Sequence, residues 1–90
     1  MPSDYKTLKE KVLEEAKACA KRGPGYSQQR VVLDNVAESL GTKDLNIQRA
    51  ILTCWHDLFR EGELSWGYDL DNPGAPFFHV PERDVARAGV

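Results

Sequence analysis

The sequence predicts an α+β domain in which three helices are followed by a two-stranded β-hairpin. Apolar residues recur every three or four positions as far as about residue 61, the spacing of helices that bury one face. After that the pattern changes: Leu64, Trp66 and Tyr68 alternate with small or polar residues, as in a half-buried strand. The proline- and glycine-containing run 72–76 then favours a turn, and a second strand follows to Val80.

The helical part of the chain shows start signals, apolar stripes and glycine stops in the expected order. The helices are predicted at about residues 4–22, 28–40 and 45–61, the hairpin at about 63–80, and a short terminal helix in the tail 81–90. The N-cap candidates are Ser3 or Asp4 for the first helix, Ser27 for the second, and Asp44 or Thr42 for the third. The predicted core includes Tyr5, Leu8, Val12, Ala16, Cys19, Val32, Val36, Ile47, Ile51, Cys54, Trp55, Leu58, Leu64, Trp66 and Phe78.

Composition points to one domain over residues 1–90. A hydrophobic content of 41% and a charged content of 29% are ordinary for a soluble globular chain. The net charge of −2 is unlike the basic surface of proteins that bind phosphate indiscriminately. The sequence suggests neither a membrane span of about 20 apolar residues nor a signal peptide. We therefore expect a cytoplasmic protein with reduced cysteines.

The link between the second and third helices is only Gly41 to Asp44, which is typical of a helix-turn-helix. With the hairpin that follows, the order resembles the winged helix-turn-helix domains of bacterial regulators over about residues 4–83. Leu58 to Gly62, followed by Leu64, is similar to that family's passage from recognition helix into the first wing strand. His79 to Arg83 is similar to its strand exit, Leu-Thr-x-x-Gly, although Pro81 replaces the threonine and Asp84 stands where the glycine would fall. The resemblance identifies no subfamily.

This resemblance implies a non-enzymatic transcription regulator whose third helix reads double-stranded DNA in the major groove. The third-helix residues expected to face DNA are Asn46, Arg49, Thr53, His56 and Arg60. Arginine pairs with guanine and asparagine with adenine, so the residue types suit base reading. Backbone phosphate contacts are expected at the start of the second helix, from Ser27, Gln28 and Arg30. The alternatives are that the third-helix set is simply the solvated side of an amphipathic helix, and that the second-helix set is an ordinary polar cap.

The hairpin loop has the wrong charge for a DNA-gripping wing. Asp69 and Asp71 would repel any phosphate within a Debye length of about 8–10 Å. An alternative function is therefore a protein-interaction module that uses the acidic, proline-rich wing through Asp69, Leu70, Asp71 and Phe77. Equally, Leu70 and Phe77 can fold back onto the core.

The sequence suggests no catalytic, metal or cofactor site. Cys54 and His56 lie two positions apart on a helix and point in different directions. The segment from Asp69 begins like a calcium loop, but Pro73 occupies a ligand position and no glutamate closes the loop. Because so small and acidic a domain would bind DNA weakly, we expect a homodimer through the first helix or a place in a larger assembly.

Overall fold

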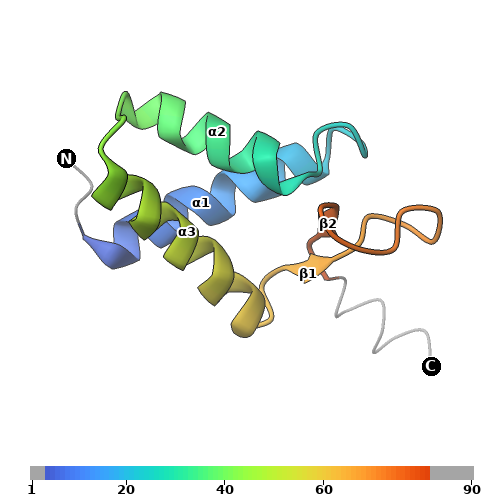
Figure 1. Ribbon diagram of the computed structural model, residues 1–90. Coiled ribbons are helices and arrows are strands. Elements are labelled where there is room, and N and C mark those ends of the chain that lie inside the picture. The colour runs from blue at the N-terminus through green and yellow to red at the C-terminus, as the bar shows by residue number, and fades with distance from the viewer. Residues whose placement is uncertain (1–3, 82–90) are drawn as a thin grey trace.

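The computed structural model describes residues 4–81, which form three helices followed by a small antiparallel sheet (Figure 1). The elements are α1 (Tyr5–Ala20), α2 (Gln29–Leu40), α3 (Leu45–Arg60), β1 (Ser65–Trp66) and β2 (Phe78–His79). This confirms the predicted α+β layout of three helices and a hairpin wing. The predicted terminal helix, apart from its first residue Pro81, lies outside the described residues.

The helix ends follow local chemistry, with one exception. Asp4 caps α1 by accepting a hydrogen bond from the Thr7 amide, and Asp44 caps α3 in the same way. Gly41 ends α2 in the left-handed conformation, with φ of 62°. The exception is the start of α2, where the N-cap is Gln28 and makes no side-chain capping bond. The prediction of Ser27 as the N-cap was wrong.

The core lies between the three helices and the inner side of the hairpin. Its buried residues are Leu8, Val12, Ala16, Cys19, Val32, Val36, Ile51, Cys54, Trp55, Leu58, Leu64 and Phe78. Trp55 is fully buried and meets Phe78 edge-to-face, with 5.2 Å between ring centroids. Its indole N–H donates to the Gln29 side chain at 3.0 Å, so the one polar atom of the ring is satisfied. Both cysteines are free and buried, as predicted.

Two aromatic residues predicted for the core lie at its margin instead. Trp66 is 38% exposed: it stacks on Phe59 with 4.2 Å between centroids, which covers one face of the ring. β1 is a two-residue strand beyond the end of α3, so Trp66 lies at the edge of the core. Tyr5 is 45% exposed because it lies in the first turn of α1, where its hydroxyl donates to Asp57.

The wing is joined to the segment between α1 and α2. β1 pairs with β2 in the register Ser65 with His79 and Trp66 with Phe78. The residues before α2 pair with β2 and the chain just before it. The Phe78 amide donates to the Ser27 carbonyl at 3.1 Å, and the Gln29 amide donates to the Pro76 carbonyl at 3.0 Å. The chain before α2 therefore acts as a third, short sheet segment. It anchors the hairpin to the helical part of the molecule.

Candidate nucleic-acid interface

The outer face of α3 is open to solvent along the whole helix. All five residues predicted to face DNA are exposed, namely Asn46, Arg49, Thr53, His56 and Arg60. Since Ile51, Trp55 and Leu58 hold the opposite side of the helix in the core, this orientation is fixed by burial. The structure therefore brings the five residues onto one accessible surface.

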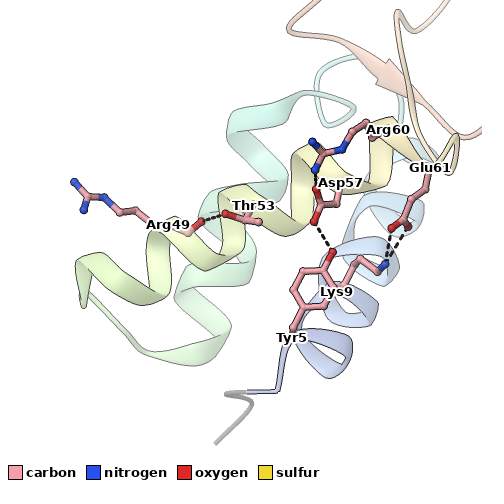
Figure 2. A network of polar contacts seen from close by, with 7 residues as sticks. All are labelled: Tyr5, Lys9, Arg49, Thr53, Asp57, Arg60 and Glu61. Carbon is pink, nitrogen blue, oxygen red and sulfur yellow. Dashed lines mark hydrogen bonds and ion pairs between the residues drawn. The ribbon is translucent and has the colours of Figure 1, made fainter.

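Arg49 is the free cation of this surface. In Figure 2 its side chain extends away from α3 into solvent, and within residues 4–81 it forms no ion pair. One turn later, the Thr53 hydroxyl donates to the Arg49 carbonyl at 3.0 Å. That back-bond uses the hydroxyl proton but leaves the oxygen able to accept a further hydrogen bond. Arg49 can therefore donate to a ligand, and Thr53 can accept.

Arg60, at the far end of α3, is already engaged. Its guanidinium forms an ion pair with Asp57, and the other Asp57 oxygen accepts the Tyr5 hydroxyl from α1 (Figure 2). Asp57 is largely buried, with a side-chain exposure of 14%, so these two partners replace water in stabilising its carboxylate. The i,i+3 spacing of Asp57 and Arg60 was a readable signal for this pair. Of the two α3 arginines, Arg49 is thus the more available.

A second contact holds the end of α3 against α1. The Lys9 ammonium donates to both Glu61 carboxylate oxygens, at 2.8 and 3.0 Å (Figure 2). This hydrogen bond raises the pKa of Lys9 above its ordinary value. Neither the Lys9–Glu61 contact nor the Tyr5–Asp57 contact was predicted. Both join residues far apart in the sequence, which no local pattern reveals.

The residues predicted to hold phosphate at the start of α2 do not form one set. Ser27 is fully buried and its hydroxyl donates to the Phe78 carbonyl, so it is inaccessible to a phosphate. This corrects its predicted role. The Gln28 side-chain amide lies 3.4 Å from the Pro24 and Gly25 carbonyls in the preceding turn. Arg30 is 90% exposed and only loosely paired with Asp34, at 3.5 Å, which leaves it as the available cation here.

At the wing tip, the Asp69 side chain stabilises the turn. One of its oxygens accepts the amides of Asp71 and Asn72, at 3.1 and 2.8 Å, which closes the turn. Leu70, between them, is 96% exposed and so does not fold back onto the core. Phe77 is partly buried, and its backbone pairs with Gln28. The tip therefore presents an apolar side chain flanked by carboxylates.

The remaining reactive groups lie away from these surfaces. Burial raises the pKa of Cys19 to about 11, and that of Cys54 is raised by the same cause. Both thiols are therefore protonated near neutral pH and poor nucleophiles. Within residues 4–81, no three histidine, cysteine or acidic side chains gather as a metal would require. None of the helices in that range combines the length and apolarity needed to span a bilayer.

Comparisons of the chain with protein-family models, with curated proteins and with solved structures find no match. A function for the chain is therefore inferred from the chemistry of the surfaces described above.

Proposed function

We propose that this chain is a non-enzymatic winged-helix module that binds double-stranded DNA by inserting the first turns of α3 into the major groove. The observation that carries the proposal is the exposed stripe of Asn46, Arg49 and Thr53, in which Arg49 is paired with no carboxylate of residues 4–81. Arginine and asparagine are the side chains best suited to guanine and adenine edges. Arg30, at the start of α2, and Lys43, just before α3, are both exposed and are suited to phosphate contacts.

The length of α3 supports a division of labour along it. Its 16 residues span about 24 Å, and a recognition helix contacts base edges mainly through its N-terminal residues. If those turns read bases, the C-terminal turn lies further from the base edges. Arg60, which is neutralised by Asp57, then contributes little, while His56 lies between the two regions. Base contacts should therefore be concentrated at Asn46, Arg49 and Thr53.

The charge around α3 argues for modest affinity. Its cations and carboxylates are nearly balanced: Lys43, Arg49 and Arg60 against Asp44, Asp57, Glu61 and Glu63. Since phosphate neutralisation supplies much of the binding energy of most DNA-binding proteins, one copy should bind weakly. A homodimer through α1, or a larger assembly, would supply the missing affinity by placing two copies of α3 on one duplex.

The proposal is tested by fluorescence anisotropy of a labelled random-sequence duplex at low salt. The wild-type chain should bind, and Arg49→Ala should weaken binding by about fivefold or more, because it removes the free cation of the stripe. Arg60→Ala, which removes the α3 arginine that is paired with Asp57, is the matched control and should change the affinity by less than about twofold. Absence of wild-type binding at millimolar duplex, or an unchanged affinity in Arg49→Ala, would contradict the proposal.

A second candidate function is protein binding by the wing. The observation that favours it is Leu70, which is 96% exposed at a tip whose charged neighbours are Asp69 and Asp71. Leu70 lines one site together with Trp66, Tyr68 and Pro73. A contiguous apolar patch of this kind is typical of interaction surfaces. The same carboxylates would keep the wing away from phosphate. The two functions are compatible, since they use different residues of the chain.

A further inference from the structure

The wing carries a groove next to the exposed leucine. Trp66, Tyr68, Leu70, Pro73 and His79 line it, and its volume is about 390 Å³. Leu70 and Trp66 are 96% and 38% exposed, so apolar surface at this site faces solvent. A groove with an aromatic wall and a proline is suited to an aliphatic or proline side chain of a peptide.

The groove is held in shape by its own backbone. Gly67 has φ of 100°, and a Cβ there would lie 2.6 Å from the Pro73 carbonyl oxygen, so the backbone on the two sides of the wing loop is in close contact at this point. The His79 ring donates from Nδ1 to the Gly67 carbonyl at 2.6 Å, and Trp66 is stacked on Phe59. The surface is therefore already ordered in the folded protein, and binding a ligand would cost it little further conformational entropy.

Charge identifies the kind of ligand. From Glu61 to Val80 the sequence contains no lysine or arginine, whereas Glu63, Asp69 and Asp71 are exposed. Lys17 and Lys21, from α1 and the residue after it, line a neighbouring cavity that shares Tyr68 and His79 with the groove. A partner that approaches over the wing tip thus meets carboxylates, which attract cations and repel nucleic acid.

We propose that the wing groove binds a positively charged peptide segment of a partner protein. An aliphatic side chain of the segment lies between Trp66 and Leu70, and its lysine or arginine residues lie beside Asp69 and Asp71. This inference rests on the second candidate function and assigns its partner a chemistry.

The test is selection from a random-peptide display library on the immobilised full chain, followed by affinity measurement on the selected peptides. We expect peptides enriched in lysine or arginine together with leucine, isoleucine or proline. Leu70→Ser should weaken their binding about tenfold or more, and Asp71→Asn several-fold, with the remaining affinity falling as salt rises. The matched control is Leu45→Ser, which removes an exposed leucine of α3 and should leave peptide binding unchanged.

The other outcomes distinguish an error in the charge of the partner from an error in the wing as a protein-binding surface. Neutral or acidic peptides that need Leu70 would overturn the positively charged partner while leaving the wing as a protein-binding surface. Acidic peptides whose binding needs Lys17 and Lys21 would also overturn the positively charged partner, and would show that peptides bind in the neighbouring cavity instead of the groove. If every selected peptide binds Leu70→Ser as well as wild type, both the groove and the second candidate function are contradicted.

Discussion

The outer face of α3 and the tip of the wing differ in what their side chains are free to do. On α3, Arg49 extends into solvent without an ionic partner among the described residues. At the wing tip, the polar group of Asp69 is bonded to its own turn, and the group left free is the apolar side chain of Leu70. One small fold thus exposes a free cation on one surface and a free apolar side chain on the other, and the two proposed functions rest on this difference.

The largest expected effect is a loss of stability when the close backbone contact inside the wing is disturbed. Gly67→Ala would force a side chain into a left-handed backbone and against the Pro73 carbonyl, which is only 2.6 Å from the new Cβ position. We expect a loss of about 2–4 kcal/mol in the free energy of unfolding, measured by urea denaturation. Gly25→Ala is the control, because a Cβ there meets nothing within 4 Å, and it should change stability by less than about 0.5 kcal/mol. Equal effects of the two substitutions would show that the wing is not rigid at Gly67.

The next effect separates stability from DNA contact at the start of α2. Ser27→Ala removes a buried hydroxyl that donates to Phe78, so it should cost about 1–3 kcal/mol of unfolding free energy in urea denaturation. DNA affinity, measured under conditions where the variant is folded, should stay at the wild-type value. A folded Ser27→Ala protein with clearly weaker DNA binding would restore Ser27 as a phosphate contact.

A smaller effect tests the charge of the wing. Asp71→Lys should strengthen duplex binding by about two- to fivefold at low salt, because it replaces repulsion of nearby phosphates by attraction. Asp71 is preferable to Asp69 for this change, since the Asp69 carboxylate closes the turn through the Asp71 and Asn72 amides. Anisotropy titrations at two salt concentrations provide the measurement. No gain at low salt would place the wing beyond reach of the duplex.

The smallest expected effect concerns the far end of α3. Arg60→Ala should change duplex affinity by less than about twofold, because Asp57 already neutralises that guanidinium. The comparison is with Arg49→Ala under the same conditions. A loss as large as that of Arg49→Ala would mean that DNA lies along the whole helix.

The sequence was sufficient for features that depend on local periodicity. The apolar stripes correctly assigned Val12, Val36 and Trp55 to the core, and the caps at Asp44 and Gly41 set helix ends within a residue or two. The same periodicity predicted the exposed side of α3, because a helix with one buried face must expose the other.

Features that depend on long-range pairing were not predictable in this way. Ser27 precedes a helix and so has the position of an N-cap, but its partner Phe78 lies far along the chain. Strand alternation assigned Trp66 to a side of the sheet without revealing that the strand lies at the edge of the core. A proline- and leucine-containing turn also does not reveal whether Leu70 points inward or outward.

The most direct test of the central claim is an NMR titration of the ¹⁵N-labelled chain with duplex DNA at low salt. The account predicts that the amides of Asn46, Arg49 and Thr53 shift first and furthest, while those of Leu70 and Asp71 stay near their free positions. Shifts concentrated at the wing tip, or no shifts on α3 at millimolar duplex, would contradict it.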